Sequence, residues 1–402
     1  MRYRWSLMLS KSAFPLLLLN MFLANLSMGL VIPIVPELLE EFSASGQAAG
    51  YLVSCFGLTQ FIFSPIAGNL SDRYGRKPMI IIGLVLFALS NLLAAFASDL
   101  TLLFASRLIG GIGSAALIPS IIAYIADITA DDQRSKSMSW LGASMTSGFI
   151  IGPGVGGLLA EWGIKMPFYV SACVGVLAMV CSFWGLPESV SANIRQMRRQ
   201  VEEKRDNVFR QIALSVRSRY FVKLLIVFTM TFGLTHFEAI FPLFVVQVYG
   251  FTTSQIAILL TVCSLIGTLN QLLLTDRITR RFGEKQIIVA MLLLSAVSLV
   301  FLLISGDFYY VMVITMLFFT FNNILRPTIN TLLSRVAGDE QGFVAGMNNA
   351  YTSLGTIFGP LLAGILFEVH FDLPYLFGAF VLLVSSIFTG SRLKNLSSPQ
   401  HS

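Results

Sequence analysis

The sequence predicts an all-α integral membrane protein with twelve transmembrane helices, arranged as two pseudo-symmetric bundles of six. Two observations carry this prediction: the chain is apolar along most of its length, and its second half repeats features of the first. Of its 402 residues, 55% are hydrophobic and only 12% are charged, and the mean hydropathy is +0.77. A soluble core of this size cannot bury so much apolar surface, so the composition indicates a chain that lies in a bilayer.

The internal repeat is clearest in a glycine-proline segment. The run G-F-I-I-G-P-G-V-G-G at residues 148–157 returns in weaker form as G-T-I-F-G-P-L-L-A-G at residues 355–364. Gly75 in R-Y-G-R-K-P returns as Gly283 in R-F-G-E-K-Q at nearly the same separation. A shared separation predicts two tandem halves, and an even number of spans in each half gives both the same orientation, as in parallel-repeat transporters.

Apolar stretches of about 20 residues, enough to cross a hydrocarbon layer of about 30 Å, predict the helices in order. Charges and turn residues delimit six of them at 14–36, 47–69, 78–97, 101–126, 137–160 and 166–186. Six more follow at 219–247, 253–275, 286–304, 309–334, 342–367 and 373–391. The predicted domains are an N-terminal bundle at 1–186, a cytoplasmic connector at 187–218 and a C-terminal bundle at 219–402.

Positive charges predict the orientation, because Lys and Arg near span ends stay on the cytoplasmic side during insertion. Placing both termini and the connector in the cytoplasm leaves only Lys165 in an outer loop, with Arg107 and Arg326 inside spans. The net charge of +6 then follows from topology and gives no support to a nucleic-acid partner. We expect a multi-pass protein of the plasma membrane.

The sequence does not indicate an enzyme. It has no nucleophile paired with a base, no metal ligands at suitable spacing and no glycine loop for a nucleotide. We therefore expect no catalytic residues, no metal and no bound cofactor.

One acidic residue lies deep within a predicted span: Glu238, in T-H-F-E-A-I-F-P. A carboxylate in hydrocarbon is costly, so such groups face the bundle interior and usually mark ion pathways. Because burial favours the protonated form until water or a cation arrives, we interpret Glu238 as a proton carrier. The alternatives are a structural hydrogen bond, or a position nearer the outer surface if Pro242 shifts the helix end. His236, on the opposite side of the helix, is better explained by packing than by a proton relay.

Two arginines lie inside predicted spans. Arg326 is in line with Asn322 and Asn330, and its partner is either Glu238 or backbone carbonyl groups. Arg107 is followed on its own helix face by small residues, which let a neighbouring helix approach closely. Glu238, Arg107 and Arg326 are the predicted proton-coupling residues.

Polar and aromatic residues that recur on single helix faces predict a substrate cavity at the interface of the halves. Its predicted lining includes Glu238 and Arg326, and the other members are Asn25, Phe56, Gln60, Thr235, Phe241, Gln271, Asn322, Asn323, Asn348 and Tyr351. For the aromatic members the alternative is packing against lipid or other helices, since a chain with 33 Phe places them on every face.

The loop after the second span, G-N-L-S-D-R-Y-G-R-K-P at residues 68–78, combines a glycine, an acid and three cations. Asp72 can accept hydrogen bonds from the N–H groups of a turn or a helix N-terminus, and the cations hold the loop at the cytoplasmic face. The predicted gate comprises Gly68, Asp72, Arg73, Gly75, Arg76 and Lys77. Positive charge that serves topology alone would not require the glycine and the acid.

These motifs resemble those of the major facilitator superfamily. G-x-L-S-D-R-x-G-R-K is similar to its signature loop, L-F-A-S-R-L-I-G-G-I-G-S-A-A at residues 103–116 to its fourth-helix arginine motif, and the glycine-proline run to its antiporter motif. The antiporter motif residues are Gly148, Gly152, Pro153, Gly156 and Gly157. G-L-V-I-P-I-V-P (29–36), F-G-L-T-H-F-E (232–238), L-R-P (325–327) and G-D-E-Q-G-F (338–343) resemble proton-coupled multidrug (fluoroquinolone) exporters of the NorA and Bmr type.

The resemblance implies the major facilitator fold, alternating access, and export of hydrophobic compounds, cationic or zwitterionic, driven by proton entry. It also implies that Glu238 takes part in protonation and drug recognition, that Arg107 acts in coupling and that Asp72 belongs to an inner gate. Where similar exporters carry an acid in F-D-x-x-R-P, this chain has Asn323 in N-N-I-L-R-P. The missing carboxylate bears on the number of protons exchanged and on the preference for cations.

Two transport functions stay open at this point. In a proton/drug antiporter, protonation of Glu238 and binding of substrate would exclude each other. The alternative is an exporter dedicated to one endogenous metabolite or lipid. In both, the partners are small-molecule substrates, protons and the lipid bilayer, the proton gradient supplies the energy, and the chain is expected to function as a monomer.

Overall fold

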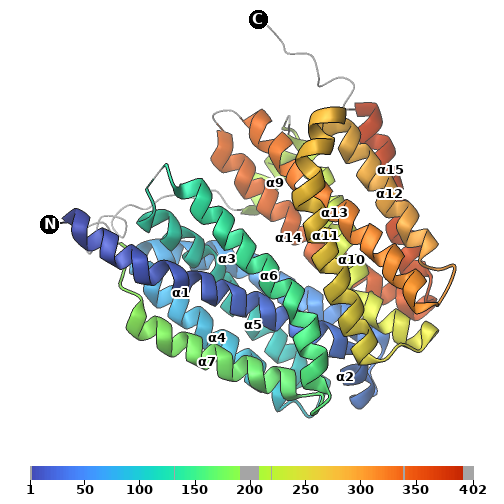
Figure 1. Ribbon diagram of the computed structural model, residues 1–402, viewed down its shortest axis with the longest axis horizontal. Coiled ribbons are helices and arrows are strands. Elements are labelled where there is room, and N and C mark those ends of the chain that lie inside the picture. Colours follow the sequence, from blue (N-terminus) through green and yellow to red (C-terminus); the bar gives the residue numbers. More distant parts are fainter. Residues whose placement is uncertain (1, 131, 191–207, 219, 338–339, 393–402) are drawn as a thin grey trace, which may run out of the picture. The chain divides into compact units, whose positions relative to one another are not determined.

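The computed structural model describes residues 2–130, 132–190, 208–218, 220–337 and 340–392 (Figure 1). Twelve helices in these ranges are long and apolar enough to cross a membrane. The predicted all-α class with twelve spans is therefore confirmed, and the chain is a multi-pass membrane protein.

The chain divides into two compact units. Unit 1 comprises Met1–Ala44 and Cys55–Arg205, and unit 2 comprises Ser45–Ser54 and Asp206–Ser402. The first residues of the second span thus belong with unit 2. The predicted bundle boundaries at 186 and 219 stay a prediction, because most of the predicted connector, residues 191–207, lies outside the described residues.

Unit 1 begins with a span that is broken by proline. Pro33 lies in a short 3-10 helix and Pro36 is the second residue of the helix after it, and neither residue can donate a backbone hydrogen bond. The described elements of unit 1 are α1 (Arg2–Val31), η1 (Ile32–Ile34), α2 (Val35–Glu41), most of α3 (Gly46–Tyr74), α4 (Arg76–Ala95), α5 (Leu100–Ile128), α6 (Arg134–Ala160) and α7 (Met166–Gly185).

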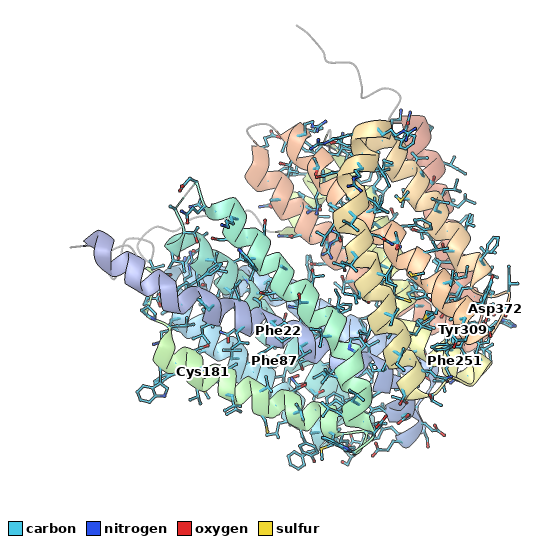
Figure 2. The ribbon with its side chains drawn as sticks, viewed as in Figure 1. Phe22, Phe87, Cys181, Phe251, Tyr309 and Asp372 are labelled. Carbon is cyan, nitrogen blue, oxygen red and sulfur yellow. The ribbon has the colours of Figure 1, made fainter. Side chains whose placement is uncertain are left out.

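Unit 2 has well-defined helix ends. The first long helix stops at Gly250, whose positive φ of 69° is suited to glycine, and the next starts with a capping box between Thr252 and Gln255. Phe251, Tyr309 and Asp372 lie at this end of the unit (Figure 2). The described elements are α9 (Val208–Ser215), α10 (Phe221–Tyr249), α11 (Thr253–Phe282), α12 (Glu284–Phe301), α13 (Phe308–Ala337), α14 (Gln341–Val369) and α15 (Leu373–Arg392).

The same helix pairs pack together in both units. In unit 1, α1 lies along α6, and α4 lies against α5 and α7. In unit 2, α10 lies along α14, and α12 lies against α13 and α15. The first and fifth spans of each unit are thus neighbours, as are the third, fourth and sixth.

Glycines on α6 permit its contact with α1. A Cβ atom on Gly152 would lie 2.6 Å from Cα of Gly29, and one on Gly156 would lie 2.2 Å from the carbonyl oxygen of Leu30. Gly148 lies equally close to the α1 backbone. The predicted antiporter motif is therefore a surface on which two backbones meet without intervening side chains.

The second glycine-proline helix makes the equivalent contact in unit 2. A Cβ atom on Gly355 of α14 would lie 2.8 Å from Cβ of Thr231, and one on Gly359 would lie 2.5 Å from Oγ1 of Thr235. Backbone polar groups of α14 are consequently within reach of side chains on α10.

Replacing Gly156 by alanine tests the need for this contact. The new methyl group would overlap the α1 backbone, and we expect a loss of stability of about 1–3 kcal/mol, typical of overpacking. Thermal unfolding of the purified protein, followed by tryptophan fluorescence, measures it. Gly142→Ala on the same helix is the matched control, because nothing lies within 4 Å of the added atom. Equal unfolding temperatures for both variants would contradict the assignment.

Candidate functional site

Glu238 lies in the middle of α10, farther from both helix ends than any other acidic residue in the described spans. Its side chain is half-buried and makes no hydrogen bond or ion pair with the described residues. Arg326 on α13 is near enough for its charge to act on the carboxylate, yet the two do not form an ion pair. Because Arg326 is itself exposed, water shares in its solvation.

The polar neighbours of Glu238 on α10 form hydrogen bonds with the backbone of other helices. The hydroxyl of Thr235 donates to the carbonyl oxygens of Thr231, at 2.9 Å, and Gly355, at 3.1 Å. His236 is buried and its two ring nitrogens face backbone carbonyl groups of α14 and α15. Glu238 is thus left as the polar group of this stretch that the described helices do not satisfy.

The polar residues of α13 turn toward different neighbours. Asn322 is only 2% exposed, and its Nδ2 donates to Oγ of Ser295 on α12 at 3.2 Å. Asn323 faces α11, where a Cβ on Gly267 would lie 2.9 Å from its Nδ2. Arg326, one turn after Asn322, is exposed. Asn322 therefore serves the packing of α12 on α13, whereas Asn323 and Arg326 keep polar groups that helix packing does not bury.

Three other residues of unit 2 that are predicted to line the cavity share no hydrogen bond with Glu238. Nδ2 of Asn348 donates to Oδ1 of Asn330 at 3.2 Å and joins α14 to α13. The hydroxyl of Tyr351 lies 2.9 Å from Oγ of Ser215 on α9. Gln271 on α11 is half-buried and makes no hydrogen bond with the described residues.

Phe241 belongs to the core of unit 2. It is fully buried and stacks on Phe237 with ring centroids 4.6 Å apart. Phe237 in turn lies 4.6 Å from Phe318 of α13. Phe241 thus packs against other helices, which is the alternative to a place in the lining of the substrate cavity.

Arg107 lies on α5 of unit 1, half-buried. Its guanidinium group lies 5.7 Å from the ring centroid of Phe168 on α7, and its Nε donates to Oγ of Ser106 at 3.4 Å. No carboxylate is paired with it among the described residues. The charge is balanced by an aromatic face, so a change in its surroundings meets no ion pair that must first be broken.

Two predicted residues of α3 lie along α5. Nε2 of Gln60 donates to Oγ of Ser114 at 3.1 Å. A Cβ on Gly110 would lie 3.3 Å from the ring of Phe56. Gln60 and Phe56 therefore lie in the contact of α3 with α5, whereas Arg107 of α5 is directed at α7.

The side-chain amides of Asn20 and Asn25 on α1 donate hydrogen bonds within unit 1. Asn25 donates to the carbonyl oxygen of Met21 on its own helix at 2.8 Å. Asn20, which the sequence analysis missed, is fully buried and donates to Oγ of Ser182 on α7 at 2.8 Å. The sequence shows Asn20 as one amide in an apolar span, with no indication of its partner.

The predicted gate contains an ionic cluster around one buried arginine. Arg76 is 6% exposed and its NH2 nitrogen lies 2.7 Å from Oδ1 of Asp72. Its Nε lies 3.1 Å from Oδ2 of Asp127 at the end of α5, and its NH1 nitrogen donates to Oγ of Ser71 at 3.2 Å. We call Ser71, Asp72, Arg76, Asp127 and Glu188 the Arg76 cluster. A single guanidinium group thus joins the ends of α3, α4 and α5.

Glu188 completes the Arg76 cluster from the segment after α7. Its carboxylate accepts hydrogen bonds from the backbone N–H groups of Arg76, at 2.9 Å, and Lys77, at 3.2 Å, at the N-terminus of α4. Gly75 precedes this turn with φ of 115°, and a Cβ there would lie 2.3 Å from Oε2 of Glu188. Sequence reasoning missed Glu188 and Asp127, since the run P-E-S at 187–189 is too short to interpret alone.

The remaining gate residues surround this cluster. Arg73 lies in the last turn of α3, where its positive charge interacts favourably with the negative end of the helix dipole. Lys77 lies over the ring of Phe183 at 5.5 Å. Gly68 has nothing within 4 Å of its Cβ position, so packing does not explain its being glycine.

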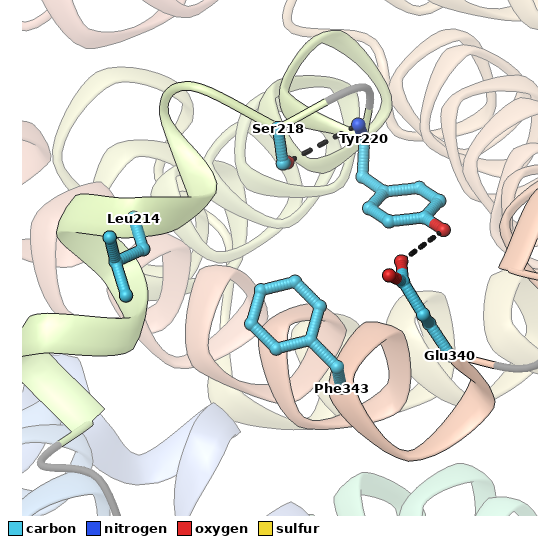
Figure 3. Close-up of a pocket in the computed structure, with 5 residues that line it drawn as sticks. All are labelled: Leu214, Ser218, Tyr220, Glu340 and Phe343. Carbon is cyan, nitrogen blue, oxygen red and sulfur yellow. Dashed lines mark hydrogen bonds between the residues drawn. The ribbon is translucent and has the colours of Figure 1, made fainter.

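A cavity of about 560 Å³ lies at the start of α10 in unit 2 (Figure 3). Its lining residues are Leu214, Ser218, Tyr220, Glu340 and Phe343. Within it the hydroxyl of Tyr220 donates to Oε2 of Glu340 at 2.6 Å. None of the predicted site residues lines this cavity.

Comparison with known proteins shows which family the chain resembles. The sequence profile of the Major Facilitator Superfamily matches residues 17–351 and 272–400. Multidrug resistance protein 2 of Bacillus subtilis (strain 168) is 40% identical over 374 residues, which cover 93% of each chain. Quinolone resistance protein NorA of Staphylococcus aureus (strain COL) is 34% identical over 356 residues, covering 88% of this chain and 90% of NorA.

Solved structures share the fold. The crystal structure of the nucleoside transporter NupG aligns over 95% of this chain and 99% of its own, with a TM-score of 0.77 and 16% sequence identity. At that identity the likeness concerns the fold alone.

Replacing Arg76 by lysine tests the Arg76 cluster. A single ammonium group cannot reach Asp72, Asp127 and Ser71 together as the guanidinium fork does. We expect the free energy of unfolding to fall by about 1–3 kcal/mol, because Asp72, Asp127 and Ser71 lose hydrogen bonds to a charged donor. Thermal unfolding checks this, with Arg134→Lys on the exposed start of α6 as the control. An unchanged unfolding temperature for Arg76→Lys would refute the bridging role.

Proposed function

The chain belongs to the Major Facilitator Superfamily, and we propose that it is a multidrug efflux transporter that exchanges drugs for protons. The proposed substrates are hydrophobic and carry a positive charge or both charges. Two relatives support the drug specificity: the Bacillus subtilis protein is named for multidrug resistance, and the Staphylococcus aureus protein for quinolone resistance.

The observation that carries the proton coupling is the position of Glu238. A charged side chain at the centre of a span costs roughly 3 kcal/mol, and the described residues give Glu238 no hydrogen bond or ion pair to offset this. A proton removes the cost, and so does a cationic substrate beside the carboxylate. One site can therefore accept either ligand, and each ligand excludes the other.

Arg326 would adjust which substrates the site accepts. Its positive charge acts on Glu238, so the pair carries no net charge when the carboxylate is ionised and a positive charge when it is protonated. Protonation would thus repel a cationic substrate and promote its release. With Asn323 in place of a second acid, we propose that one carboxylate performs this exchange on α10 and α13.

Transport would follow from two conformations that bind the two ligands differently. If the drug favours the conformation open to the cytoplasm and the proton the one open to the outside, each ligand shifts the population in its own direction. We propose that Arg107 responds to this change, because its charge rests on a ring and not on a carboxylate. In the same scheme the Arg76 cluster forms the cytoplasmic gate.

The proposed setting is the plasma membrane, with both termini in the cytoplasm. No cofactor or enzymatic step enters the scheme, the proton gradient supplies the energy, and one chain is sufficient. An exporter dedicated to a single endogenous metabolite or lipid would use the same machinery. Expression in a drug-sensitive host separates the two: resistance to several unrelated dyes and antibiotics supports multidrug export, and resistance to none supports the dedicated exporter.

The variant Glu238→Gln tests the coupling. Because an amide does not titrate between about pH 5 and about pH 8, we expect pH-gradient-driven efflux of ethidium from proteoliposomes to be abolished. Thermal unfolding confirms that the variant is folded. The matched control is Glu161→Gln, which changes an exposed carboxylate at the end of α6 and leaves efflux unchanged. Coupled efflux by folded Glu238→Gln at the wild-type rate would rule out the proposed role.

A further inference from the structure

His236 is a buried titratable residue that the proposed transport scheme does not use. It lies on α10 with 2% of its surface exposed. Its Nδ1 is 2.9 Å from the carbonyl oxygen of Gly359 on α14, and its Nε2 is 2.8 Å from the carbonyl oxygen of Pro374 on α15. Both ring nitrogens therefore face hydrogen-bond acceptors, and neither faces a donor.

The number of protons on the ring decides whether both contacts are favourable. A neutral imidazole carries one N–H donor and one lone pair, whereas the imidazolium ion carries two donors. In the neutral state one nitrogen lone pair would face a carbonyl oxygen at hydrogen-bond distance, which is repulsive. Only the doubly protonated ring donates to Gly359 and Pro374 at once.

The faces of the ring also suit a cation. Phe232 stacks on the imidazole with centroids 5.1 Å apart, and Phe377 lies at 6.2 Å. Aromatic faces attract positive charge. Space for the ring comes from α15, where a Cβ on Gly378 would already lie 3.4 Å from Cδ2 of the imidazole.

No carboxylate in the described part of the chain holds this charge permanently. Among the described titratable residues of the adjoining elements, Glu238 points to the opposite side of α10 and Glu368 of α14 accepts a hydrogen bond from Gln47 N–H. Asp372, just before α15, lies 3.6 Å from His370.

The hydroxyls of Tyr351 and Tyr249 are engaged elsewhere, whereas the buried hydroxyl of Tyr375 has no hydrogen-bond partner among the described residues. Tyr375 packs on Phe244, Tyr351 contacts Ser215 and Tyr249 donates to the carbonyl oxygen of Leu302. Lys223 and Glu284 lie in the first turns of α10 and α12. Burial opposes a charge on His236, whereas the two carbonyl groups and the aromatic rings favour it.

We infer that His236 is a second proton-binding site of unit 2, whose protonated ring ties α10 to both α14 and α15. Loss of the proton releases one of these two ties, so the occupancy of the site alters how firmly the three helices are joined. The site itself does not depend on the proposed drug export, although its effect on proton stoichiometry does.

Nitrogen NMR of the full-length protein in lipid nanodiscs tests this inference. The chain has three histidines, so the variant His370→Gln/His401→Gln, labelled with ¹⁵N-histidine and purified without a histidine tag, leaves one signal source. We expect two protonated nitrogens at about pH 5 and a neutral ring at about pH 8. A neutral ring at about pH 5 in the folded protein would overturn the inference.

A further variant secures the assignment and separates the two proposals. His236→Gln must remove the signal from the difference spectrum between it and the wild type, even if the double variant fails to fold. If transport proves independent of protons while the imidazolium is observed, the proposed function fails and the proton site stands. If export is proton-coupled while the ring stays neutral, only the inference about His236 fails.

Discussion

The packing of α14 against α10 is the constraint on which the site in unit 2 depends. Glycines at 355 and 359 let the two backbones approach until side chains of α10 reach carbonyl groups of α14. Thr235 and His236 use those carbonyl groups, so most of the polarity of this stretch is consumed by helix packing. Unit 1 makes the same contact between α6 and α1, where the facing residues of α1 are apolar or glycine. Both units therefore pack their first and fifth spans through glycines, but only in unit 2 do polar side chains bond to the exposed backbone of that contact.

Glu238, unlike its neighbours on α10, has no hydrogen bond or ion pair with the described residues. A buried polar group without a partner costs about 1–3 kcal/mol, and α10 avoids that cost at Thr235 but not at Glu238. Arg326 could have formed an ion pair with it, and instead stays exposed at longer range. In the Arg76 cluster, by contrast, the charges are paired at 2.7 and 3.1 Å. Among the described residues, charges are thus paired where helix ends are joined, whereas Glu238 within a span has no ion pair, so that a mobile ligand can take the partner's place.

Hydropathy and charge were sufficient to predict the spans, because twenty apolar residues in succession have few other stable arrangements. Glu238 could be identified from the rarity of acids in spans. Partners were harder to predict. Asp127 and Glu188 lie 51 and 112 residues from Arg76 in sequence, and nothing local marks their contact. Asn322 follows the same periodicity as Arg326 yet is buried against Ser295. The acceptors of His236 are backbone carbonyl groups, which every residue has and no sequence pattern distinguishes.

The most direct test of the central claim, that substrate and proton compete at Glu238, is to count the protons released when substrate binds. Purified protein in weakly buffered solution at about pH 7 is titrated with ethidium while a pH indicator reports release, and calorimetry measures binding. The account predicts that the release per bound ethidium falls by about one proton in Glu238→Gln, compared at dye concentrations high enough to overcome the weaker binding of this variant. Equal proton release from the wild type and Glu238→Gln, at equal ethidium occupancy, would contradict it.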